Sequence, residues 1–107
     1  MSNYTIPKLS HLQFAVLEVL LRVRDGKKTT MIGEEVRIAL GKVGIDRKGP
    51  AFFQLMRRLE AAKLVESDYR IHLKRGDEIK KRHYEITDEG IRALNETRQF
   101  YDGRTNA

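Results

Sequence analysis

The sequence predicts a mainly α fold with a small β-hairpin, and three observations support this prediction. Amphipathic segments with helix-capping signals follow one another over residues 10–63. A segment with alternating side chains and a glycine-containing turn follows them, as is typical of a hairpin. The run RHYEITDEGIRAL, residues 82–94, then joins a strand to a helix through Thr87, whose hydroxyl can cap that helix.

The first helix is expected from Ser10 to about Arg24. Ser10 can cap it, and Gln13 stands three residues later, as in a capping box. Apolar residues cover most of its surface, so we expect this helix to be central. Residues 1–9 are expected to form an extended arm, because Pro7 resists continuation of a helix.

The second helix is expected to begin after Thr29 or Thr30 and to stop near Gly41. The third is expected over about Pro50–Lys63, with Gly49 as its N-cap, because proline suits the first helical position. The spacing places Phe52, Phe53, Met56 and Leu59 on its inner face, and Gln54, Arg57, Arg58 and Ala61 on its outer face.

Two strands are expected at about Leu64–Lys74 and Lys81–Ile86, joined by the turn RGDEIK. A last helix follows, roughly Asp88–Tyr101, ending near Gly103. This order of elements is that of a winged helix-turn-helix with an added C-terminal dimerisation helix. The length suits a single domain over residues 1–107, with an arm (1–9), the winged helix (10–86) and the C-terminal helix (87–103).

The charge balance favours a polyanionic partner. The chain has 21 Lys and Arg against 15 Asp and Glu, a net charge of +6, and residues 70–83 are especially basic. The chain has no cysteine, which excludes disulfides and thiol chemistry. No long apolar segment or secretory signal is evident, so we expect a cytoplasmic protein without a membrane partner.

The winged-helix order predicts binding to double-stranded DNA, with the third helix in the major groove and the hairpin near phosphates or the minor groove. The candidate contacts at the third helix are Arg47, Lys48, Gln54, Arg57 and Arg58. Arg and Gln can pair with guanine and adenine edges, whereas Lys48 suits a phosphate. The candidate wing contacts are Lys74, Arg75, Lys80, Lys81 and Arg82. The alternatives are a solvated helix face and lysines that protect an edge strand.

A chain this short gains stability from association, so we expect a homodimer. The candidate interface residues, in the arm and the last helix, are Tyr4, Ile6, Ile91, Leu94, Phe100 and Tyr101. The alternative is that the last helix packs on its own core.

Catalytic and metal-binding chemistry is not expected. His11, His72 and His83 are the histidines of the chain, and the latter two can approach each other across the hairpin, but no third ligand stands at a recognisable spacing. The sequence also lacks a nucleophile–base arrangement and a phosphate-binding glycine loop. We therefore predict a non-enzymatic protein with no metal site and no cofactor.

Three segments also resemble a known family. LSHLQFAVLEVLL, FFQLMRRLEAAKLV and RHYEITDEGIRAL, within Leu9 to Leu94, are similar in order and spacing to segments of PadR-like transcriptional regulators of the short form. The resemblance implies a sequence-specific DNA-binding regulator, a repressor that dimerises through its C-terminal helix. Some short members bind flat aromatic compounds between subunits, so a small aromatic effector is a candidate partner.

The sequence is also compatible with two other functions. The first is a winged-helix protein-interaction module whose apolar C-terminal helix binds another chain without specific DNA binding. The second is a small-molecule sensor whose dimer pocket controls DNA affinity.

Overall fold

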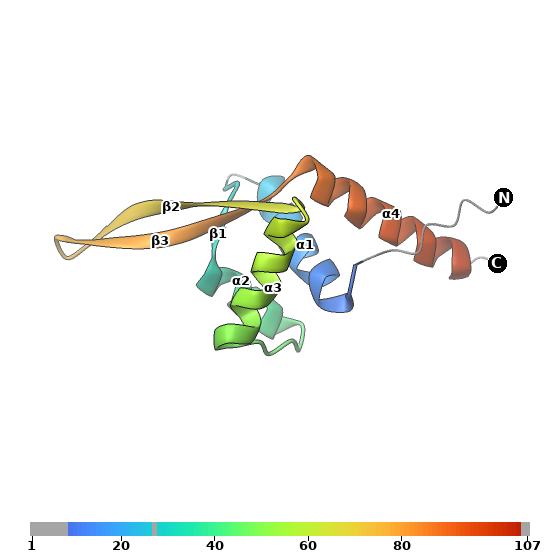
Figure 1. The fold of residues 1–107 in the computed structure, drawn as a ribbon, viewed down its shortest axis with the longest axis horizontal. Helices are drawn as coiled ribbons and strands as arrows, with labels where there is room; N and C mark the ends of the chain where they lie inside the picture. Colours follow the sequence, from blue (N-terminus) through green and yellow to red (C-terminus); the bar gives the residue numbers. More distant parts are fainter. Residues whose placement is uncertain (1–8, 27, 106–107) are drawn as a thin grey trace.

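The computed structural model describes residues 9–26 and 28–105 of the chain. The elements are α1 (His11–Arg24), β1 (Met31–Ile32), α2 (Gly33–Lys42), α3 (Gly49–Ala61), β2 (Val65–Lys74), β3 (Asp77–Ile86) and α4 (Asp88–Thr105). The β2–β3 hairpin extends from one end of the helical body and α4 from the other, in a molecule of 60 × 26 × 25 Å (Figure 1). The predicted fold class, a winged helix-turn-helix followed by a helix, is confirmed. Within the described ranges, no helix is both long and apolar enough to cross a membrane.

The start of α1 follows the predicted capping box. The Ser10 hydroxyl accepts a hydrogen bond from the Gln13 amide at 3.1 Å, and the Gln13 side chain accepts one from the Ser10 amide at 3.0 Å. These bonds satisfy two backbone donors that a helix start leaves open. From there α1 places Val16, Leu17 and Leu20 in the core, which confirms its central position.

The sheet contains a third strand that sequence patterning did not predict. Its order is β1-β3-β2, and β1 pairs antiparallel with β3 through Met31 opposite Tyr84 and Ile32 opposite His83. Two residues are too few to show an alternating pattern, and β1 moves the start of α2 from the predicted Thr29 or Thr30 to Gly33. Glu35 holds this start: it accepts hydrogen bonds from the Ile32 amide at 3.0 Å and the Lys28 ammonium at 2.5 Å.

The core face of α3 differs from the prediction at one residue. Phe52, Met56 and Leu59 are buried as expected, but Phe53 is 60% exposed. Successive residues of a helix point about 100° apart, so Phe53 cannot share the face of Phe52. Leu55, predicted near the boundary, completes the buried stripe at the i, i+3, i+4, i+7 spacing.

The hairpin is longer and its turn tighter than predicted. Residues Asp77–Lys80, expected in the turn, belong to β3, and Lys74 pairs directly with Asp77. Arg75 and Gly76 form a two-residue turn with φ angles of 53° and 82°. Positive φ at both positions is the geometry of a type I′ turn, whose twist matches that of the strands and lets pairing resume at once.

The first half of α4 packs on its own chain. Leu94 is 0% exposed within the core, and the partly buried Ile91 packs against the same core. The prediction of Leu94 as a dimer contact is therefore wrong, because its side chain is already buried in the core of its own chain. Arg98 of α4 also forms an ion pair with Glu18 of α1 at 3.1 Å. The other predicted contacts Tyr4 and Ile6 lie outside the described residues.

Gly90 allows α4 to begin close to the end of α3. A methyl group on its Cα would lie 2.2 Å from the Leu64 carbonyl oxygen and 2.7 Å from an Ile86 side-chain carbon. We expect Gly90→Ala to lower the free energy of unfolding by about 1–3 kcal/mol, because the backbone must shift to accept the methyl group. Urea unfolding followed by circular dichroism measures this change.

The matched control is Gly41→Ala, a helical glycine in α2 whose added methyl would meet nothing within 4 Å. This variant should be as stable as the parent chain or up to about 1 kcal/mol more stable, since alanine favours a helix. Equal stability of the Gly90→Ala variant and the parent would contradict the close contact.

Candidate nucleic-acid interface

The outer face of α3 carries the predicted base-contacting side chains. Gln54, Arg57 and Arg58 are all exposed on it. Arg47 and Lys48 are exposed just before its first turn, and Lys48 occupies the N-cap position. The 3.9 Å ion pair between Lys48 and Asp46 joins two largely exposed side chains and holds Lys48 weakly. Cations thus border the start of an exposed helix face.

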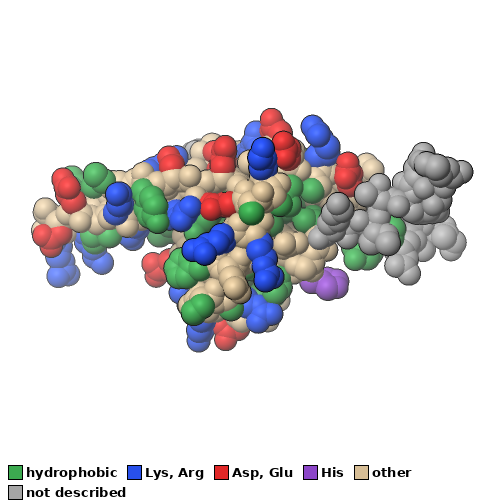
Figure 2. All heavy atoms as spheres, in the orientation of Figure 1, with side chains coloured by type: hydrophobic (Ala, Val, Ile, Leu, Met, Phe, Trp, Pro, Cys, Tyr) green, Lys and Arg blue, Asp and Glu red, His purple; other side chains and the backbone are tan. Residues whose placement is uncertain are grey.

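The wing, defined here as the β2–β3 hairpin, distributes its cations over two faces. Arg70 pairs with Lys81, Ile71 with Lys80 and Tyr69 with Arg82. Because side chains alternate along a strand, Lys74 and Lys81 share one face, and Lys80 and Arg82 share the other, with Arg75 in the turn. Figure 2 shows Lys and Arg side chains projecting from the lower edge of the outer hairpin, the side toward which α3 descends in Figure 1.

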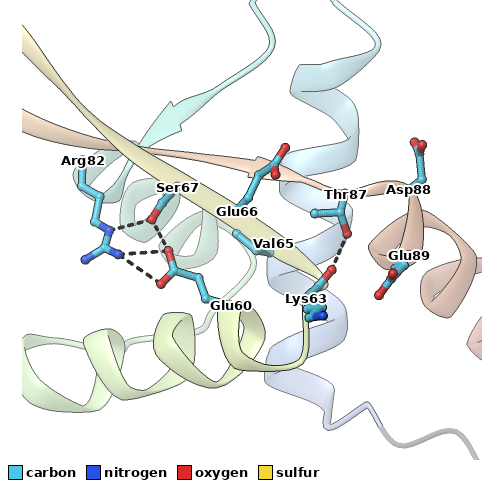
Figure 3. A pocket seen from close by; sticks show the side chains of 9 residues that line it. All are labelled: Glu60, Lys63, Val65, Glu66, Ser67, Arg82, Thr87, Asp88 and Glu89. Atoms are coloured by element: carbon cyan, nitrogen blue, oxygen red, sulfur yellow. Dashed lines mark hydrogen bonds and ion pairs between the residues drawn. The ribbon is translucent and has the colours of Figure 1, made fainter.

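Arg82 has an intramolecular role that the sequence did not predict. Its guanidinium forms hydrogen bonds to both carboxylate oxygens of Glu60 in α3, at 3.1 and 3.3 Å, and to the Ser67 hydroxyl at 2.7 Å (Figure 3). The Ser67 hydroxyl in turn donates a hydrogen bond to Glu60. These bonds connect α3 to the base of the wing and engage one terminal nitrogen of Arg82 within the chain.

A hollow beside this connection is unsuitable for phosphate. It has a volume of about 510 Å³, and its lining includes four carboxylates, those of Glu60, Glu66, Asp88 and Glu89 (Figure 3). Their negative charge would repel a phosphate group. The two cations of this hollow are Lys63 and Arg82, and Arg82 is already bound to Glu60. A nucleic-acid surface is therefore better placed on the exposed side of α3 and the outer wing.

Two histidines of the wing lie next to each other, and one of them contacts the segment that precedes β1. His83, 7% exposed, is within 2.9 Å of the Thr30 hydroxyl through Nδ1 and within 2.7 Å of His72 through Nε2. This confirms the predicted approach of His72 and His83. Burial lowers the pKa of His83 below its ordinary value, and the positive charge of Arg70 lowers it further. No group of three metal-ligating side chains forms among the residues that the structure describes.

The C-terminal half of α4 and the start of α1 border a small apolar cavity. Its volume is about 190 Å³, and its lining residues are Leu9, Ser10, His11, Phe14, Thr97 and Tyr101. Tyr101 is exposed and Phe100 half-buried, and their rings meet edge to face at 5.5 Å. Among the dimer residues predicted in the described part of α4, Phe100 and Tyr101 are the two that do not belong to the hydrophobic core.

Acidification should destabilise the chain through His83. Its folded pKa is depressed, so the unfolded chain binds more protons below about pH 6.5, the ordinary histidine value. The stabilisation is complete above that pH and is lost as the pH falls through the folded pKa. We expect the urea midpoint of the parent chain to be lower at pH 5.5 than at pH 7.5.

Replacing His83 with Gln should reduce this dependence on pH. The control is His11→Gln, which removes an exposed histidine at the start of α1 and should keep the full dependence. The same pH dependence in the His83→Gln variant and the parent chain would show that another group is responsible.

The fold resembles solved structures of PadR-family regulators. No family model and no curated protein matches the chain. Solved structures do match. A PadR-family regulator from Clostridium difficile has a TM-score of 0.71 and 18% identity over 91% of this chain and 93% of that one. A PadR-family regulator from Eggerthella lenta has a TM-score of 0.63 and 26% identity over 89% of this chain and 80% of that one. Bacillus subtilis PadR, solved in complex with operator DNA, matches with a TM-score of 0.60 and 18% identity over 82% of this chain and 46% of that one. These neighbours are transcriptional regulators, the non-enzymatic class that the sequence predicts, and the chain has the winged-helix fold of the PadR family.

Proposed function

We propose that this chain is a sequence-specific, double-stranded DNA-binding transcriptional regulator that acts as a homodimeric repressor in the cytoplasm. The observation that carries the proposal is the exposed face of α3, with Gln54, Arg57 and Arg58, beside a basic outer wing. The likeness of the fold to a regulator solved with operator DNA supports it.

In this proposal α3 enters the major groove, and its outer face contacts base edges. Arg57 can donate two parallel hydrogen bonds to guanine, and Gln54 can form a donor–acceptor pair with adenine. Arg58 lies next to Arg57 at the edge of the same face. Arg47 and Lys48, at the start of α3, contact phosphates and fix the position of the helix.

The wing supplies affinity rather than sequence preference. Lys74, Arg75, Lys80 and Lys81 lie on its outer half, where they can neutralise phosphates beside the α3 site. Each neutralised phosphate should steepen the salt dependence of binding by about 0.9 logarithmic units per decade. Arg82 joins this set in the sequence prediction, but its bonds to Glu60 favour a supporting role.

The homodimer is proposed to form through the C-terminal half of α4, where Phe100 and Tyr101 lie beyond the part packed on the core. A partner subunit there would also cover the apolar cavity next to Tyr101. That cavity is the location that we propose for a small aromatic effector, because its lining is apolar and includes aromatic rings.

One observation favours the alternative function, a protein-interaction module. Tyr69, Ile71 and Leu73 project from one face of the wing, and Leu73 is 75% exposed. Exposed apolar groups that are adjacent mark interaction sites. DNA-binding measurements distinguish the two functions, because the interaction module does not require specific duplex binding.

The primary test is selection of bound sequences from random duplex DNA. We expect enrichment of one sequence with two half-sites related by a two-fold axis, and a complex of two chains per duplex measured by its mass. Titrations at several salt concentrations should show a preference for the selected duplex that persists at each one. Equal affinity for selected and random duplexes would exclude the regulator and leave the interaction module.

Substitutions should separate base contacts from phosphate contacts. We expect Arg57→Ala or Gln54→Ala to weaken the selected site by about 1–3 kcal/mol and to relax the preference at one base pair. Lys80→Ala and Lys81→Ala should instead weaken all duplexes similarly and lower the salt slope by about 0.9 for each lost contact. Binding titrations on selected and random duplexes measure both effects. An equal loss of preference in both sets of variants would contradict this division.

A further inference from the structure

The exposed aromatic ring of Phe53 is a feature of α3 that the core does not explain. Its side chain is 60% exposed, while the adjacent Phe52 is 1% exposed. The two rings meet edge to face with centroids 5.8 Å apart and an angle of 71°. Because Phe52 is fixed in the core, this contact restricts the position of the Phe53 ring at the surface.

The neighbours of Phe53 on the helix are the proposed base contacts. A helix turns by about 100° per residue, so Phe53 shares its side of α3 with Pro50 and Arg57, one turn away on either side. Gln54 follows it directly and is also exposed. Residues 49–59 contain no acidic side chain. An apolar ring therefore stands beside an amide group and cationic groups. The cations attract a polyanion and would repel a second copy of the same basic surface.

We propose that Phe53 contacts the 5-methyl group of a thymine in the major groove and so selects thymine at one position of each half-site. This inference rests on the proposed DNA-binding function. The thymine methyl is the apolar group that the major groove presents at a base edge, and a phenyl ring can cover it. Gln54 and Arg57 recognise polar edges, so Phe53 supplies the part of recognition that hydrogen bonds cannot. Covering one methyl group corresponds to about a 4-fold gain in affinity.

The test removes that methyl group alone. Each thymine of the selected duplex is replaced in turn by deoxyuridine, which keeps the base pairing and lacks the 5-methyl group. We expect one position per half-site at which the substitution weakens binding of the parent chain by about 4-fold. Phe53→Ala should bind the thymine and deoxyuridine duplexes equally, whereas Phe53→Leu should retain part of the difference, because leucine still covers a methyl group.

The control variant is Leu73→Ala, which removes an exposed apolar side chain from the wing and should keep the full sensitivity to the methyl group. Absence of any sensitive thymine in the parent chain overturns the inference, as does sensitivity that persists unchanged in Phe53→Ala. Both results leave specific DNA binding intact. Failure of the parent chain to prefer any duplex instead overturns the proposed function, and the inference with it.

Discussion

The junction where α3 ends and α4 begins determines how the rest of the molecule is arranged. The Thr87 hydroxyl donates to the Lys63 carbonyl at 2.7 Å and accepts from the Gly90 amide at 3.0 Å, while the Thr87 amide donates to the Leu64 carbonyl at 3.1 Å. One residue therefore caps α4 and ties it to the chain that leaves α3. At the end of β3, Arg24 of α1 donates to the Ile86 carbonyl at 2.9 Å. These bonds tie α1, the end of β3, the start of α4 and the residues that follow α3 to one another.

Local signals of capping and periodicity predicted most of the fold. Ser10 and Thr87 begin helices as expected, because a capping bond spans only three residues and its partners are visible in the sequence. Leu94 was predicted in a dimer seam because an apolar position on an isolated helix does not show which surface covers it. Arg82 and Glu60 lie 22 residues apart, and nothing local indicates that they meet. The two-residue β1 was too short to carry any period.

The candidate site was predicted as a set of residues rather than as a surface. Gln54, Arg57 and Arg58 were assigned outward from the helix period, and their exposure agrees. Phe53 was wrongly assigned to the inner face of α3. The prediction followed the rule that apolar side chains are usually buried, although the helix period turns Phe53 away from the face of Phe52. The structure separates the wing cations by face, which depends on strand register, and register depends on the tight turn at Arg75 and Gly76.

The register of the wing also limits how its length can change. Each strand has ten residues, and the pairing is continuous from the turn to the base. Inserting one residue into β3 near the turn would reverse the side-chain alternation beyond it, so that Lys80 and Lys81 would exchange faces. Inserting two residues at the turn, or one residue in each strand, lengthens the hairpin by one pair. The side chains at the base of the wing then keep their faces. Wings of this kind can therefore vary in reach only by paired steps, while single-residue changes have to be absorbed by a bulge.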